Sequence, residues 1–215
     1  MPNESNLIRA SELLNRLDLE GAIAAVGRDY VLNPTDPGSY LNLGLILVNA
    51  KMPDHAIRVL NAGLECDPNH ATILAYRGQA YTLLGQSDLA EKDYNDALSS
   101  NPSNLGALYG LGMLRIDQEA YDEADHLFTQ LIEAHGGNPP VYVERAYARA
   151  KQGKIRDAID DCTKALNIDP NFVAALSTRA ELYKQIGETR KAALDNRKLR
   201  SLENAFQIIQ HIQKR

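Results

Sequence analysis

One feature of the sequence constrains the fold more than any other: the chain repeats itself every 34 residues. The tripeptides Asp67-Pro68-Asn69 and Asp169-Pro170-Asn171 lie 102 residues apart, which is three such periods. A fixed period of this length indicates an array in which each unit packs only on its neighbours. Alanine recurs once in every period, at Ala22, Ala56, Ala90, Ala124, Ala158 and Ala192.

Each period predicts two helices. In the second unit, apolar and small residues follow the helical spacing i, i+3, i+4, i+7 and i+10, and a second stripe of the same kind follows after a break. Pro53 suits the first turn of the second helix, and Pro68 ends it, because proline disfavours helix in the residue before it. The two stripes are Tyr40, Leu43, Gly44, Leu47 and Ala50, then Ala56, Val59, Leu60, Gly63 and Leu64.

Small residues at the eighth and twentieth positions of each unit predict the places where paired helices cross most closely. Position 8 is Gly44 in the second unit and Gly78 in the third, and position 20 is always alanine. A larger side chain at these positions is expected to cost about 1–3 kcal/mol by overpacking.

This pattern resembles the tetratricopeptide repeat, whose units carry a large residue at position 4, Leu at 7, a small residue at 8, Ala at 20, an aromatic residue at 24, Ala at 27 and Pro at 32. The third unit matches with Leu74, Gly78, Ala90, Tyr94 and Pro102. The resemblance implies an all-α fold, a right-handed superhelical α-solenoid with a C-terminal capping helix. The predicted units are 3–36, 37–70, 71–104, 105–138, 139–172 and 173–206, and 207–215 is the end of the capping helix.

The two terminal units depart from the pattern. Asn6 and Asp29 replace the bulky residue and the last alanine of the first unit, and Asn196 and Asn204 replace the aromatic residue and proline of the sixth. Atypical end units are expected because they cap the stack.

The resemblance also implies where function lies, because the first helix of each unit lines the concave face through positions 2, 5, 6, 9, 12 and 13. Apolar residues there would be costly on a face that met only water, so we expect a groove that binds an apolar or amphipathic protein segment. The alternative is that neighbouring first helices bury part of this stripe. The candidate residues are Leu41, Asn42, Leu45, Tyr76, Gln79, Tyr109, Met113, Val143, Tyr147 and Lys151, and Val48, Ala75 and Glu144 lie on the same predicted face.

Two binding devices of the family are not expected. The carboxylate clamp would need Lys, Asn and Arg at set positions, and of these the first three units offer only Asn42. An asparagine ladder at position 6 is likewise reduced to that one residue.

Catalysis is not expected, and neither is a metal or a cofactor. The histidines His55, His70, His126, His135 and His211 lack metal-ligand spacing. No nucleophile elbow or phosphate-binding loop occurs. Asp122-Glu123 and Asp160-Asp161 are predicted to be solvated, since adjacent helical side chains point about 100° apart.

Arg77, Arg145 and Arg179 stand at position 7, where leucine is usual. Either they form a ladder of binding arginines, or their stems pack while their heads reach carboxylates of neighbouring helices.

Charge and cysteine content exclude several classes. A net charge of −5, from 23 Lys plus Arg against 28 Asp plus Glu, argues against a nucleic-acid partner. No apolar stretch is long enough to cross a bilayer and the first residues lack a signal peptide's features, so a cytoplasmic protein is expected. Cys66 and Cys162 lie in units three apart, too far for a disulfide, and both are predicted to be small buried residues.

The C-terminal stripe of Leu202, Phe206, Ile209 and Ile212 allows two interpretations. It caps the last repeat, or it is a self-association surface that forms a homodimer. The second interpretation carries an alternative function, a self-assembling structural protein.

Overall fold

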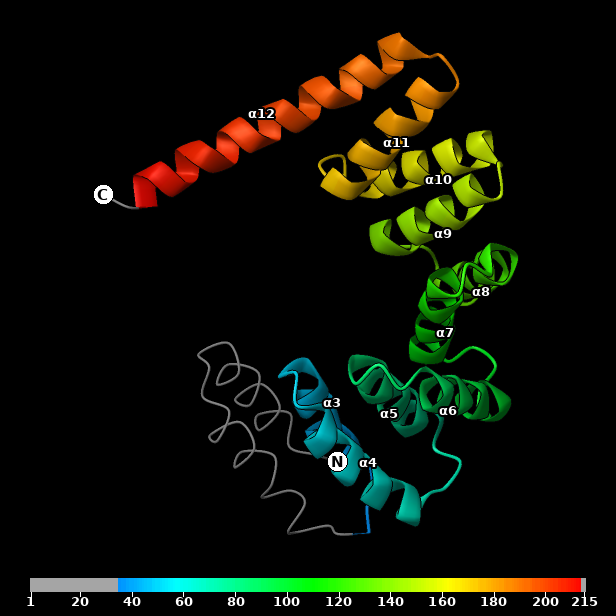
Figure 1. Ribbon diagram of the computed structural model, residues 1–215. Coiled ribbons are helices and arrows are strands. Elements are labelled where there is room, and N and C mark those ends of the chain that lie inside the picture. Colours follow the sequence, from blue (N-terminus) through cyan, green and yellow to red (C-terminus); the bar gives the residue numbers. More distant parts are fainter. Residues whose placement is uncertain (1–34, 214–215) are drawn as a thin grey trace. The chain divides into compact units, whose positions relative to one another are not determined.

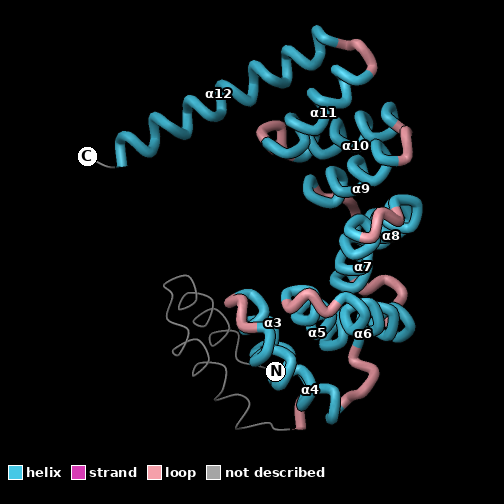
Figure 2. The backbone as a smooth tube through the Cα atoms, in the orientation of Figure 1, coloured by secondary structure: helices cyan, strands magenta, loops and turns pink. Residues whose placement is uncertain are grey.

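The computed structural model describes residues 35–213, with side chains as far as Ala205. All regular secondary structure in this part of the chain is helical (Figure 2). The chain forms two compact blocks, which we call the N-terminal block (Met1–Leu114) and the C-terminal block (Arg115–Arg215). The predicted first repeat, 3–36, lies outside the described residues except for its last two.

The N-terminal block is built from consecutive helix pairs (Figure 1). Helix α3 packs on α4, α4 on α5, and α5 on α6, while α3 also lies beside α5. The helices are α3 (Pro37–Asn49), α4 (Pro53–Cys66), α5 (Ala71–Leu83), α6 (Ser87–Ser100) and α7 (Leu105–Asp117), of which α7 belongs to this block as far as Leu114.

The C-terminal block follows the same plan. Helices that follow one another from α8 to α12 pack together, and α9 also lies beside α11. The helices are α8 (Tyr121–His135), α9 (Pro139–Lys151), α10 (Ile155–Ile168), α11 (Val173–Gln185) and α12 (Thr189–Gln213). Every described first helix and every described second helix begins 34 residues after the previous one of its kind.

The side chain of the residue just before the first helix caps α3, α5, α7 and α9, whereas Phe172 before α11 makes no such bond. The Asp36 carboxylate accepts hydrogen bonds from the backbone N–H groups of Gly38 and Ser39 at 3.2 and 3.1 Å. The equivalent residues of the next three repeats, His70, Asn104 and Asn138, each accept one backbone N–H bond at 3.0–3.3 Å. These caps satisfy backbone donors that the first helical turn leaves without a partner.

Two residues past the end of each described first helix, one residue lies in the left-handed region and reverses the chain toward the second helix. Three of these residues are glycines, but Lys51 (φ 58°) and Glu119 (φ 59°) occupy the same position. A non-glycine residue pays a steric cost of about 1 kcal/mol there. The glycines are Gly85, Gly153 and Gly187.

The close helix crossings predicted from small residues are present. A Cβ atom on Gly44 would overlap the side chain of Leu60, and one on Gly78 would lie 2.8 Å from the ring of Tyr94. The alanines at position 20 of the described repeats are all buried. Glycine and alanine therefore set the spacing of the paired helices, as expected.

The prediction for the two cysteines is half wrong. Cys162 is buried with Ala146, Ala158 and Leu182, and burial raises the pKa of its thiol to about 12. Cys66 is exposed, because it is the last residue of α4 and lies past the face that packs on α5. Neither of these two described cysteines forms a disulfide.

The C-terminal tail is not a separate helix. Helix α12 runs without a break from Thr189 to Gln213, 25 residues against 14 or 15 for the other described second helices. Leu202 and the preceding Leu199 pack on a cluster that includes Leu166 and Leu176, which is what a cap requires. The side chains of Phe206, Ile209 and Ile212 lie outside the described ones.

Candidate functional site: the inner faces of the first helices

The N-terminal block brings seven of the predicted groove residues onto neighbouring first helices. Helices α3 and α5 lie side by side, and a Cβ atom on Gly106 of α7 would lie 3.4 Å from Ala75 of α5. We call this surface the inner face of the N-terminal block. On α3 it holds the half-buried Leu41, Asn42 and Leu45, on α5 the half-buried Tyr76 and the exposed Gln79, and on α7 the half-buried Tyr109 and Met113.

This face carries no side chain with a formal charge. Over α3, α5 and residues 105–114 of α7, Arg77 is the only ionisable cation and there is no acidic residue. Arg77 points away to Asp93 of α6, which it binds through two hydrogen bonds of 2.7 Å each. The hydrogen bond to Asp93 raises the pKa of Arg77, and the carboxylate lies against the guanidinium group as its counter-charge. Leucine, tyrosine, methionine and amide side chains are what remains for a partner to touch.

Two residues assigned to the concave face are core residues instead. Val48 and Ala75 are both buried. Ala75 lies next to Gly106 of the neighbouring first helix α7. The accessible part of the apolar stripe is therefore narrower than the six concave positions of the repeat predict.

The C-terminal block presents a different inner face on α9. Val143 is half-buried and packs on the cluster around Leu166 and Leu176. Tyr147 is exposed and its ring meets Tyr121 edge-on at 6.3 Å between centroids. The ammonium group of Lys151 lies 5.3 Å from the centre of the Tyr147 ring, a cation–π contact.

Glu144 lies on the same helix, between Val143 and Tyr147 in the turn. It is half-buried, and burial raises the pKa of its carboxyl group above the ordinary value. The inner face of this block is therefore charged and aromatic, in contrast to that of the N-terminal block.

The arginines at position 7 bind carboxylates of neighbouring helices, which confirms the second of the two interpretations given for them. Arg145 binds Asp161 of its own repeat at 2.9 and 2.7 Å and donates to Thr129 of the preceding repeat at 3.0 Å. Arg179 does the same with Asp195 and Thr163. In the N-terminal block, Arg77 joins Asp93 to Asn61 of the preceding repeat. Each arginine thus holds two helices of one repeat and the joint to the repeat before it.

The prediction that Asp160-Asp161 is a solvated pair is wrong for one of its members. Asp160 is exposed, but Asp161 is fully buried, and Arg145 and Arg149 both bind its carboxylate. Arg149 also binds Asp125 at 2.8 Å. A buried carboxylate needs such partners, and the periodicity of the sequence does not reveal them.

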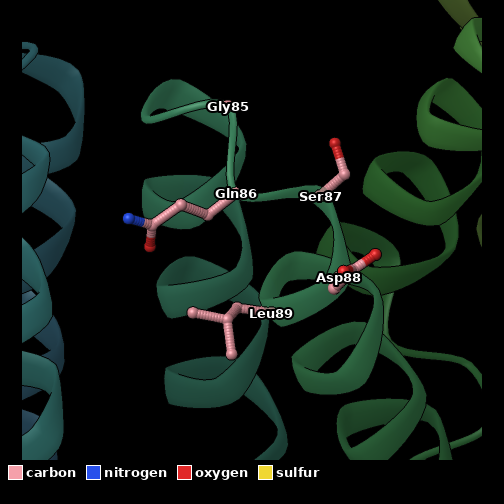
Figure 3. A pocket seen from close by; sticks show the side chains of 5 residues that line it. All are labelled: Gly85, Gln86, Ser87, Asp88 and Leu89. Carbon is pink, nitrogen blue, oxygen red and sulfur yellow. The ribbon is translucent and has the colours of Figure 1, made fainter.

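Two further features of the described residues are the arrangement of their possible metal ligands and a surface depression. No group of three or more His, Cys, Asp or Glu side chains is arranged to hold a metal ion within residues 35–213. A depression of about 380 Å³ is lined by Gly85 and Gln86 of the turn before α6 and by the first three residues of that helix, Ser87, Asp88 and Leu89 (Figure 3). Its polar side chains spread apart, so they do not converge on a common point. Across the described helices, none is long and apolar enough to span a membrane.

Comparisons with known proteins agree with this architecture. Models described as tetratricopeptide repeat match residues 37–70, 59–92, 77–139 and 109–171. The DnaJ protein P58IPK homolog of Arabidopsis thaliana is 28% identical over 83% of this chain and 40% of its own length. Anaphase-promoting complex subunit 3 of Schizosaccharomyces pombe is 22% identical over 79% of this chain and 26% of its own length. The chain therefore spans less than half of these relatives.

Solved structures share the fold at low identity. MamA from Desulfovibrio magneticus RS-1 superimposes with a TM-score of 0.70 and 20% identity, over 79% of this chain and 96% of that one. YrrB, a TPR protein with an unusual peptide-binding site, superimposes with a TM-score of 0.68 and 19% identity, over 89% of this chain and 98% of that one.

Proposed function

Because the chain belongs to the tetratricopeptide repeat family, whose members serve as protein–protein interaction scaffolds, we propose that it binds an uncharged, apolar segment of a partner protein on the inner face of the N-terminal block. The observation that carries the proposal is the absence of formal charge from that face in the described residues. An ionised segment would lose its hydration there without gaining a counter-charge, whereas an apolar segment loses little.

The residue types suit such a segment. Leu41, Leu45 and Met113 offer aliphatic and thioether surface, and Met adapts to irregular shapes. Tyr76 and Tyr109 combine a broad apolar ring with a polar tip. Asn42 and Gln79 can bond to the partner's backbone through neutral amide groups. A short unstructured segment loses entropy on binding, so affinity on the order of micromolar is expected.

The proposal is tested by selecting peptides from a displayed random library on the intact chain. We expect the selected sequences to be apolar and poor in Asp, Glu, Lys and Arg. Gln79→Glu then adds one charge at an exposed position with no change in volume, and it should weaken the selected peptides by about tenfold. Gln86→Glu, at an exposed turn in the same block, makes the same chemical change away from the face and should leave binding unchanged.

Two further variants report on the apolar residues. Leu45→Glu and Met113→Glu should abolish binding, while Leu89→Glu, at an exposed leucine of α6, should not. Selection of acidic or basic peptides, or equal binding by Gln79→Glu and Gln86→Glu, would show that the inner face is not the site.

A self-assembling role is the second candidate, and one observation favours it. Helix α12 continues about three turns past the point at which its cap residue Leu202 packs on the last repeat (Figure 1). Light scattering at several concentrations, on the intact chain and on a chain ending at Glu203, separates the two roles. A dimer that the truncation dissolves, with helicity retained, would support self-assembly, and a concentration-independent monomer would support the scaffold alone.

A further inference from the structure

We call the contact between the second helix of one repeat and the first helix of the next repeat a joint. Two positions of the second helix, 25 and 28 of the repeat, make these contacts. At position 25, Asn61, Thr129 and Thr163 each accept a hydrogen bond from the arginine of the next repeat at 2.7–3.0 Å. At position 28 an aliphatic side chain faces the next repeat, as where Leu166 packs with Ala175 and Leu176. The position-28 residues of the described inner repeats are Leu64, Leu98, Ile132 and Leu166.

Helix α12 carries arginine at both positions. Arg197 replaces the hydrogen-bond acceptor, and Arg200 replaces the aliphatic residue. Both are exposed, and among the described residues no carboxylate pairs with either. Arg200 makes only a 3.4 Å hydrogen bond from Nε to the backbone oxygen of Asn196. The edge on which a seventh repeat would pack therefore presents donors and positive charge instead of an acceptor and an aliphatic group.

The charge of this edge is opposite to that of the rest of the chain. Residues 1–188 hold 16 Lys plus Arg against 26 Asp plus Glu, a formal charge of −10, whereas residues 189–215 hold 7 against 2, a charge of +5. An edge that only needed to stay soluble could carry any polar residue. Two arginines at the joint positions of an acidic protein indicate a surface suited to an anionic group.

We propose that the α12 edge, defined by Arg197 and Arg200, binds a helix of a partner protein that carries carboxylates where the repeats carry Arg at position 7. The surface is equivalent to those of α4, α8 and α10, on which the helices α5, α9 and α11 pack, so a helix is the shape that fits it. Guanidinium groups three residues apart on one face can each bind a carboxylate in the two-bond geometry that Arg77, Arg145 and Arg179 show.

The distribution of charge on the chain disfavours other partners at the α12 edge. A long polyanion, such as a nucleic acid or an anionic membrane surface, would also meet the −10 charge of the other residues. A second copy that stacked through an arginine-bearing first helix would place its arginine against Arg197. The site is separate from the inner face of the N-terminal block, so either proposal can fail without the other.

The test uses two 13-residue peptides with the sequence of α11, Val173–Gln185, the helix that packs on the equivalent surface of α10. One peptide keeps Arg179 and the other carries Arg179→Glu. Each is closed by a lactam bridge on the opposite face, because isolated helices of this length are marginal in water. We expect the intact chain to bind the glutamate peptide about fivefold to tenfold more tightly than the arginine peptide.

A variant of the chain should reverse this preference. Arg197→Thr with Arg200→Leu recreates the α10 joint of Thr163 and Leu166, so it should favour the arginine peptide. The matched control is Arg58→Thr with Arg156→Leu, two exposed arginines of α4 and α10. It makes the same change in net charge and should leave the preference intact.

Several results would overturn the proposal. Equal affinity for the two peptides, or no binding of either, would mean that the arginines serve only as a polar cap. Binding of the chain to a poly-uridine oligonucleotide or to phosphatidylserine vesicles, lost in the Arg197→Thr/Arg200→Leu variant, would assign the edge to another class of polyanion. A change in the oligomeric state of that variant, measured by light scattering with no peptide added, would assign the edge to a second copy instead.

Discussion

The ion pair between Arg77 and Asp93 allows a sharp test of how the repeats are held together, because other repeats of the same chain carry an apolar pair at the equivalent positions. Repeat 3 carries Arg77 at position 7 and Asp93 at position 23, whereas repeat 2 carries Leu43 and Val59 and repeat 4 carries Leu111 and Leu127 at the same positions. The polar pair and the apolar pair are thus alternative solutions at one place in the repeat.

The magnitudes follow from burial. Asp93 is only 2% exposed, and Arg77 is its only salt-bridge partner among the described residues, so Arg77→Leu leaves a buried, unpaired carboxylate and should cost about 3–5 kcal/mol. The Arg77 side chain is 21% exposed and can turn its head toward water, so Asp93→Leu should cost less, about 1–3 kcal/mol. The double variant recreates the apolar pair of repeat 4 and should lie within about 1 kcal/mol of the original chain.

Urea unfolding followed by far-UV circular dichroism, fitted with a nearest-neighbour repeat model, gives the three free energies. As a control, Lys184→Leu and Glu181→Leu remove an exposed pair, with side chains that are 53% and 60% exposed, and should show coupling below about 1 kcal/mol. The double variant could instead lose as much free energy of unfolding as the two single variants together. That result would show that the apolar pair does not replace the ion pair, and it would refute this account.

Three further predictions concern the turns after the first helices, the half-buried Glu144 and the two cysteines. Because Glu119 and Gly153 both have positive φ, Glu119→Gly should raise the free energy of unfolding by about 0.5–1 kcal/mol and Gly153→Ala should lower it by about 1–2 kcal/mol. Urea unfolding measures both changes. An effect of opposite sign at either residue would contradict the turn geometry. Burial raises the pKa of Glu144 in the folded state, so the folded state loses stability as pH rises above the pKa of the unfolded chain. Glu144→Gln should therefore raise the thermal midpoint at pH 7 but not below about pH 4. A midpoint difference that does not depend on pH would exclude titration of Glu144 as its cause. In the native protein a thiol reagent should label the exposed Cys66 but not Cys162, which is buried and whose pKa is raised to about 12. Cys162 should react only after urea unfolds the chain. Rapid labelling of the folded Cys66→Ser variant would show that Cys162 is accessible.

The periodic features of the sequence predicted most of the described fold. Helix pairs follow from the apolar spacing, and the close crossings at Gly44 and Gly78 follow from small residues at one phase of the period. These features are local or repeat exactly one unit later, so they can be read without knowing which helices meet in space.

Features that depend on which helices meet in space do not follow from the periodicity of the sequence. The position of Val48 in its repeat predicts the concave face, yet the residue is buried. The sequence predicts that Asp161 is solvated, yet it is buried against Arg145. Helical periodicity gives the direction of a side chain, but it does not tell which later helix covers it. The arginines at 197 and 200 could have been found from the sequence by aligning positions 25 and 28 across the repeats, but the role of those positions appears only when the joints are seen.

The central claim is that the uncharged inner face of the N-terminal block binds a partner segment, and photo-crosslinking tests it most directly. A peptide selected on the intact chain would carry a benzophenone side chain in place of one apolar residue, and mass spectrometry would identify the crosslinked residues. We predict crosslinks on α3, α5 and residues 105–114 of α7, close to Leu45, Gln79 and Met113. Crosslinks confined to the second helices α4 and α6, or to α12, would contradict the claim.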